Sequence, residues 1–172
     1  PIRKQAALRV AVLGATGYAG VELLRLLIRH PRARVEIVTS RQYAGKRVSE
    51  IYPSLAGQCD LVLEEIRIEK IASQTDLAFA ALPHQTSMEV VAGLVGQGRR
   101  VIDLSADFRL HDPDTYLHWY RAHKAPHLLR RAVYGLTEIG CARPRTEKMN
   151  FFSGLTLTFL PIPSSLWQGM VR

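Results

Sequence analysis

Three glycines spaced by three residues carry the clearest chemistry in this 172-residue chain: Gly14, Gly17 and Gly20. An apolar run precedes them and an amphipathic segment follows, which predicts a strand, a glycine turn and a helix. There the first glycine takes a tight turn with positive φ, the second lets the backbone approach a phosphate, and the third lets the helix pack against the strand. The helix start favours an anion. The predicted pyrophosphate loop comprises Gly14, Ala15, Thr16, Gly17, Tyr18, Ala19 and Gly20.

A serine and an arginine, Ser40 and Arg41, follow the β-branched run of residues 35–39, which predicts the second strand. In dinucleotide folds the end of this strand meets the adenine ribose. A carboxylate there holds the 2′-hydroxyl of NAD, whereas an arginine accommodates the 2′-phosphate of NADP. No carboxylate occurs here before Glu50. We therefore predict NADP as the cofactor, the alternative being an arginine that is merely solvated at a strand end.

Two further strands are predicted to end at the same place. Residues 76–82 and 101–104 form apolar runs typical of strands buried on both faces, and they stop at Pro83-His84 and at Ser105. Because strands and helices alternate, we predict an α/β fold, a Rossmann-like, doubly wound, mostly parallel sheet with helices on both faces. Ligands of such sheets lie beyond the carboxyl ends of the strands. We therefore expect the glycine loop to share one cofactor crevice with Ser40, Arg41, Pro83, His84 and Ser105.

The remaining elements are predicted from local signals. The first helix should end at His30, since a proline disfavours helix at the residue before it. Residues 60–66 indicate an edge strand and residues 68–72 a short helix. Ser87 is expected to cap a helix that runs to about Val95.

Composition and charge argue against several classes of protein. The net charge is +8, but no basic helix face and no row of interleaved aromatic residues accompanies it, so we predict no nucleic-acid partner. The uncharged residues 151–171 contain prolines near their middle, so we expect no membrane span. Two cysteines are too few for a disulfide framework and suit a reducing cytosol, and no signal peptide is apparent. We therefore expect a cytoplasmic protein.

Other reactive side chains have plainer interpretations. Four histidines near two aspartates, within residues 111–127, have turn-like spacing, but no cysteine or tight ligand pair accompanies them, so we predict no metal site. Cys59 has no neighbouring histidine and is expected to be an inert thiol. Asp107 and Arg109 either meet substrate or pair with each other; the sequence leaves both open.

Four segments together resemble a known family. They are residues 14–20 (Gly-Ala-Thr-Gly-Tyr-Ala-Gly), 81–84 (Ala-Leu-Pro-His), 103–109 (Asp-Leu-Ser-Ala-Asp-Phe-Arg) and 134–138 (Tyr-Gly-Leu-Thr-Glu). The chain is similar, over about residues 8–139, to the amino-terminal half of N-acetyl-gamma-glutamyl-phosphate reductases, which belong with the semialdehyde dehydrogenases. The resemblance implies NADP-dependent reduction of a small acyl phosphate to a semialdehyde in arginine biosynthesis, by an enzyme made of identical subunits. A cysteine thiolate and a histidine of the second domain do the chemistry in that family.

The resemblance stops just past Glu138. Thr137 stands where the family has proline, and the family's Asn-Pro-Gly-Cys motif, which holds the nucleophile, does not occur. Cys141 comes too soon and lacks the flanking residues, so we predict no catalytic residue. Residues 140–172 show no sustained period and are expected to form neither strand nor helix. We predict a dinucleotide-binding domain over residues 1–139 and an atypical, divergent or truncated tail over 140–172. The chain is then a reductase by descent that is inactive as it stands. The alternatives are a non-catalytic NADP-binding module and a fragment of an enzyme like aspartate-semialdehyde dehydrogenase.

Overall fold

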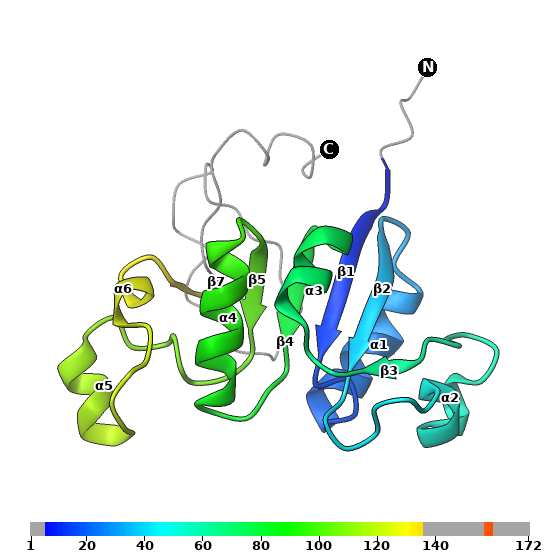
Figure 1. The fold of residues 1–172 in the computed structure, drawn as a ribbon, viewed down its shortest axis with the longest axis horizontal. Coiled ribbons are helices and arrows are strands. Elements are labelled where there is room, and N and C mark those ends of the chain that lie inside the picture. Colours follow the sequence, from blue (N-terminus) through cyan, green and yellow to red (C-terminus); the bar gives the residue numbers. More distant parts are fainter. Residues whose placement is uncertain (1–5, 136–156, 160–172) are drawn as a thin grey trace.

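A computed structural model describes residues 6–135 and 157–159. Within these residues, strands form one sheet in the order β3-β2-β1-β4-β5-β7-β6 (Figure 1). Neighbours among the first five strands run parallel, whereas β7 pairs antiparallel with both β5 and β6. The strands are β1 (Leu8–Leu13), β2 (Ala33–Thr39), β3 (Leu63–Glu64), β4 (Leu77–Ala80), β5 (Arg100–Asp103), β6 (Val133–Gly135) and β7 (Leu157–Phe159).

Helices cover both faces of this sheet, as the sequence predicts. One face packs against α1 (Tyr18–Ile28), α2 (Val48–Ile51) and the 3₁₀ helix η1 (Pro53–Leu55). The other packs against α3 (Ile68–Gln74), α4 (Thr86–Gly96) and α6 (Pro126–Leu129). The short helix α5 (Pro113–Trp119) lies beyond the β5 side of the sheet (Figure 1).

The alternation of side chains along each strand creates these two layers. In β1, Val10 and Val12 point to the α1 layer, while Ala11 and Leu13 point to the layer of α3 and α4. All four are fully buried. Because the central strand is apolar on both faces, it must lie inside a sheet that helices cover twice. The doubly wound parallel fold is therefore confirmed.

Two local predictions are wrong. Ser87 does not cap α4: the helix begins at Thr86, and Gln85 occupies the cap position with φ 70°. The buried Ser87 hydroxyl instead donates to Asp103. The expectation of neither strand nor helix after residue 140 fails for β7, because three residues are too short to show a period. Pairing with β5 defines that strand, with Phe159 opposite Ile102. The rest of the predicted tail lies outside the described residues.

Candidate functional site

The glycine loop lies directly between β1 and α1, and the fold itself requires two of its glycines. Gly14 has φ 77°, and a Cβ there would lie 2.3 Å from the carbonyl oxygen of Ala81 on the neighbouring strand's extension. A Cβ on Gly20 would lie 2.2 Å from the carbonyl oxygen of Gly14. The predicted positive φ of the first glycine is confirmed. The third glycine packs against the turn after the strand rather than against the strand itself.

Gly17 is different, because nothing in the described part of the chain demands a glycine at its position. Its φ of −79° and ψ of 165° suit any residue. A Cβ would meet only the Gly14 carbonyl oxygen, at an ordinary 3.5 Å, and the residue is exposed. The absent side chain therefore leaves open space over the loop, which is what close approach of a ligand needs.

The first turn of α1 offers hydrogen-bond donors to that space. Val21 donates its backbone N–H to the Gly17 carbonyl, but within the described residues the N–H groups of Tyr18, Ala19 and Gly20 have no acceptor. Gly17, at the cap position, supplies no side chain, and the first turn contains no acidic residue. Tyr18 and Ala19 are exposed and Gly20 is buried. N–H groups without an acceptor and an uncompensated positive helix end together suit an anion.

The end of β2 lies against this loop. The hydroxyl oxygens of Thr16 and Ser40 are 2.8 Å apart, and the backbone N–H of Tyr43 donates to Ser40 Oγ at 3.3 Å. Ser40 is buried, so its hydroxyl shapes the loop, whereas Arg41 is exposed. At the backbone of Thr16, the Tyr52 hydroxyl donates to the carbonyl oxygen at 2.6 Å.

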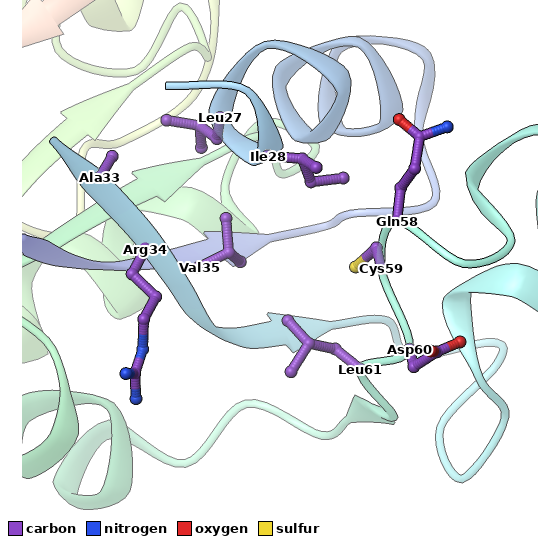
Figure 2. A pocket seen from close by; sticks show the side chains of 9 residues that line it. All are labelled: Leu27, Ile28, Ala33, Arg34, Val35, Gln58, Cys59, Asp60 and Leu61. Carbon is purple, nitrogen blue, oxygen red and sulfur yellow. The ribbon is translucent and has the colours of Figure 1, made fainter. Parts of the chain in front are cut away.

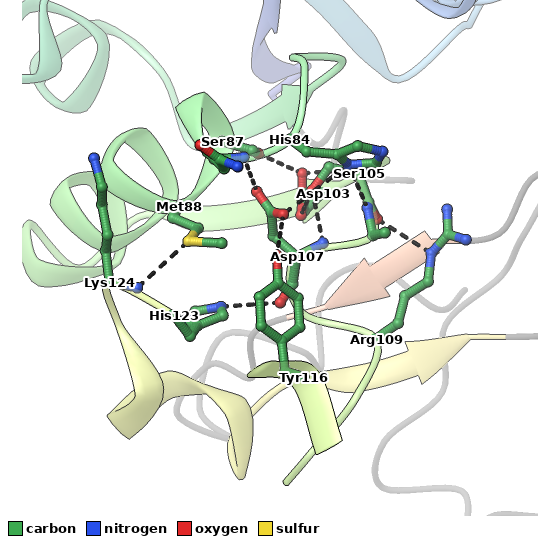
Figure 3. Close-up of polar contacts among 12 residues, drawn as sticks. His84, Ser87, Met88, Asp103, Ser105, Asp107, Arg109, Tyr116, His123 and Lys124 are labelled. Carbon is green, nitrogen blue, oxygen red and sulfur yellow. Dashed lines mark hydrogen bonds and ion pairs between the residues drawn. The ribbon is translucent and has the colours of Figure 1, made fainter. Parts of the chain in front are cut away.

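The ends of β4 and β5 come together on the same edge (Figure 3). The backbone N–H of Ala106 donates to His84 Nδ1 at 3.4 Å, which leaves the proton of a neutral ring on Nε2. The His84 side chain is 58% exposed, and its ring lies edge-on to Tyr120 with centroids 6.1 Å apart. Pro83 is exposed and Ser105 is buried. The structure thus places the predicted residues at one sheet edge; their contact with a cofactor stays a prediction.

Two buried carboxylates underlie this edge. Asp103 accepts hydrogen bonds of 2.6 Å from both Ser87 Oγ and Ser105 Oγ. Asp107 accepts bonds of 2.8 Å from the backbone N–H of Gln85 and from the Tyr116 hydroxyl. These bonds join the loop after β4 to the loop after β5 (Figure 3).

The electrostatics of this network follow from burial. Burial raises the pKa of Asp103 above its usual range, with the serine hydrogen bonds acting in the opposite direction. Burial, assisted by the Asp107 carboxylate, also raises the pKa of Tyr116, so the phenol stays a donor. Burial lowers the pKa of His123, whose Nε2 lies 2.9 Å from the Asp107 carbonyl oxygen.

The sequence left open whether Asp107 and Arg109 meet substrate or pair with each other, and the structure decides the question of pairing. Among the described residues Asp107 bonds to Gln85 and Tyr116, and Arg109 Nε donates to the Ser105 carbonyl oxygen at 3.2 Å. The two side chains therefore do not pair with each other. The half-buried Arg109 extends from the network with its terminal nitrogens pointing away from it (Figure 3).

A hollow of about 400 Å³ opens at the opposite end of β2 (Figure 2). Its walls are the end of α1, the start of β2 and residues 58–61, with Cys59 among them. The Cys59 thiol is buried and unbridged. Because the glycine loop follows the carboxyl end of the strands and the hollow lies at their amino end, Cys59 is remote from the candidate site. Cys141 lies outside the described residues.

Over the described ranges, no three histidine, cysteine, aspartate or glutamate side chains gather in a way that would hold a metal ion. His111 Nε2 lies 3.0 Å from the Ala132 carbonyl oxygen, so this histidine contacts backbone. In the same part of the chain, no helix has the length and apolar character to cross a membrane.

Comparison with known sequences decides the family. Residues 9–146 match the family described as "Semialdehyde dehydrogenase, NAD binding domain". The chain belongs to this family. An N-acetyl-gamma-glutamyl-phosphate reductase from a Geobacter species is 54% identical over 132 residues, which are 77% of this chain and 38% of that protein. One from Geobacter sulfurreducens is 51% identical, covering 83% and 41%. One from Nitrosococcus oceani is 45% identical, covering 90% and 47%. The chain thus spans less than half the length of these relatives.

A solved semialdehyde dehydrogenase shares the fold. Aspartate semialdehyde dehydrogenase with NADP from Candida albicans superposes with a TM-score of 0.54 at 24% identity, covering 60% of this chain and 31% of that one. At this identity the likeness supports the fold alone.

Sequence reasoning missed three side chains at the site of this semialdehyde dehydrogenase domain. Asp103 was detectable, because a carboxylate inside a buried apolar strand needs hydrogen-bond donors nearby. Tyr116 and Tyr52 gave no local signal. Their partners are 9 and 36 residues away, so only the folded chain brings them together.

Proposed function

We propose that this chain binds NADPH in the crevice formed by the glycine loop, Arg41, His84 and Ser105, as the nucleotide-binding part of an acyl-phosphate reductase. The single observation that carries the proposal is the pairing of an unhindered Gly17 with N–H groups at the start of α1 that have no acceptor among the described residues. A phosphate group fits this cradle, because it accepts hydrogen bonds and carries the charge that the helix end favours.

The residues present suit NADPH in particular. The N–H groups of residues 18–20 would hold the pyrophosphate, and the exposed Arg41 would hold the 2′-phosphate at the end of β2. When bound, the cofactor supplies a hydride. The chain's own residues would orient it, because the Asp103 and Asp107 network fixes the loops after β4 and β5.

The reaction class comes from the relatives. They are named N-acetyl-gamma-glutamyl-phosphate reductase, and we propose the same small acyl phosphate as the substrate of the complete enzyme, in arginine biosynthesis. A cytoplasmic setting and assembly of identical subunits belong to this proposal. So does the division into a dinucleotide-binding domain, residues 1–139, and a separate tail. In the 172-residue chain we propose nucleotide binding without turnover, because the sequence lacks an Asn-Pro-Gly-Cys motif.

Fluorescence titration with NADPH and NADH tests the proposal. Wild-type chain should bind NADPH more tightly, and Arg41→Ala should weaken NADPH by about 1.5–3 kcal/mol, roughly 10- to 150-fold, while leaving NADH nearly unchanged. Arg29→Ala, on an exposed arginine just after α1, is the matched control and should change neither. Equal or tighter binding of NADH by the wild type contradicts the proposed specificity.

A further inference from the structure

The peptide unit between Thr16 and Gly17 lies in the middle of the glycine loop and is held at both ends. Its N–H, on Gly17, donates to the Gly14 carbonyl oxygen at 3.1 Å. Its C=O, on Thr16, accepts the hydroxyl hydrogen of Tyr52 at 2.6 Å. Because the two groups of one peptide point in opposite directions, these two bonds together set the orientation of its plane.

This peptide would otherwise be free to rotate. Turning it over changes ψ of Thr16 and φ of Gly17, and a glycine accepts positive φ at almost no cost. The same open Gly17 that leaves room for a ligand therefore also removes the usual steric barrier to a flipped peptide. A flip would break the bond to the Gly14 carbonyl and would reorient the backbone that leads into α1.

The segment that carries Tyr52 is itself anchored. Val48 in α2 and Leu55 in η1 are both buried in the core layer beneath α1. The Tyr52 backbone N–H donates to the Val48 carbonyl oxygen at 2.8 Å, and Pro53 follows at the first position of η1. The hydroxyl thus reaches the loop from a support that packs on the core, 36 residues away in the chain.

We propose that Tyr52 is a positioning residue for the pyrophosphate loop: its hydroxyl holds the Thr16–Gly17 peptide in the orientation that keeps the loop ready for the cofactor. The expected effect on NADPH binding rests on the proposed function, whereas the two hydrogen bonds that hold the peptide do not depend on it. Tyr52 acts through the Thr16 carbonyl rather than by contact with the cofactor.

The test is Tyr52→Phe in the 172-residue chain, with Tyr43→Phe as the matched control. Tyr43 is a half-buried tyrosine nearby, and no hydrogen bond of its hydroxyl occurs within the described residues. Loss of one hydrogen bond should weaken NADPH about 3- to 10-fold in the Tyr52 variant. The affinity for 2′-phospho-ADP-ribose, which contains the pyrophosphate, should fall by the same factor. 2′-AMP, which lacks it, should bind as it does to the wild type. Loss of the hydrogen bond should lower the melting temperature of Tyr52→Phe by no more than about 6 °C.

A second measurement needs no ligand. In chain labelled with ¹⁵N-glycine, the Gly17 amide should exchange its hydrogen at least about threefold faster in Tyr52→Phe than in wild type or Tyr43→Phe, because the peptide is released at its carbonyl end. An unchanged Gly17 amide overturns the inference, and so does equal weakening of all three ligands or of none. If wild-type chain binds no NADPH, the proposed function fails, while Gly17 exchange still decides the role of Tyr52.

Discussion

Replacing each loop glycine by alanine separates ligand binding from folding. Gly17→Ala should not destabilise the fold, since φ −79° and ψ 165° suit alanine and the new Cβ meets nothing closer than 3.5 Å. Alanine also restricts the unfolded chain more than glycine does, which stabilises by about 0.4–1 kcal/mol at a compatible position. The melting temperature should therefore stay constant or rise by roughly 1–4 °C. The new methyl, however, occupies the open space where we propose that the pyrophosphate lies.

The cost to binding is the cost of a methyl group in a close contact. Inserting a methylene where none fits costs about 1–3 kcal/mol. NADPH affinity should accordingly fall roughly 5- to 150-fold in Gly17→Ala. The loss should appear equally with NADH, because both dinucleotides contain the pyrophosphate.

The two other glycines should behave in the opposite way. Gly20→Ala places a Cβ 2.2 Å from a backbone oxygen, which cannot rotate away as a side chain would. Gly14→Ala adds a backbone cost of about 1–2 kcal/mol, because its φ is 77°. Each of these two variants should lose about 3 kcal/mol or more of folding stability, which lowers its melting temperature by roughly 6–12 °C or more.

Thermal melts of the three variants, paired with fluorescence titration of NADPH, check this reasoning. Only Gly17→Ala should combine a native melting temperature with weak binding. A Gly17→Ala chain that melts as early as Gly20→Ala, or that binds NADPH like the wild type, refutes the assignment of the open space to the cofactor.

Two further predictions follow from the buried groups. Burial raises the folded-state pKa of Asp103, so the contribution of this group to stability is complete below its unfolded pKa near 3.8 and declines as the pH rises through its folded pKa. Plotted against pH from 4 upward, the urea midpoint of unfolding should therefore fall less steeply in Asp103→Asn than in the wild type. Identical slopes contradict this. Because Cys59 is buried and remote from the crevice, alkylation of the thiols should leave NADPH binding intact. For the same reason, absorbance assays of NADPH with N-acetyl-glutamyl phosphate should show no turnover. Turnover that disappears on Cys141→Ser would show that the tail carries a nucleophile.

The parallel sheet was predictable because each central strand carries its own evidence. Residues 10–13 are apolar without alternation, and the helix after them has one apolar face, so a strand buried on both faces is the consistent interpretation. Adjacency of the strand ends then follows from the topology of a doubly wound sheet. Strand β7 was not predictable in this way. Its three residues have no period of their own, and the free edge of β5 determines their conformation.

The spacing of the loop glycines predicts their roles only by analogy with other dinucleotide folds, and the structure supplies the physical distinction among them. The fold requires Gly14 and Gly20, because a Cβ at these positions would lie 2.3 and 2.2 Å from a backbone oxygen. No atom of residues 6–135 or 157–159 requires a glycine at position 17. A residue type that the fold does not need must be explained by something outside it.

The contacts that support the loop come from Ser40 and Tyr52, far away in the chain, so they become visible only once the strands and the segment after β2 have packed. The site is therefore a local motif whose geometry depends on distant residues, and Tyr52→Phe should weaken binding although Tyr52 does not contact the proposed cofactor.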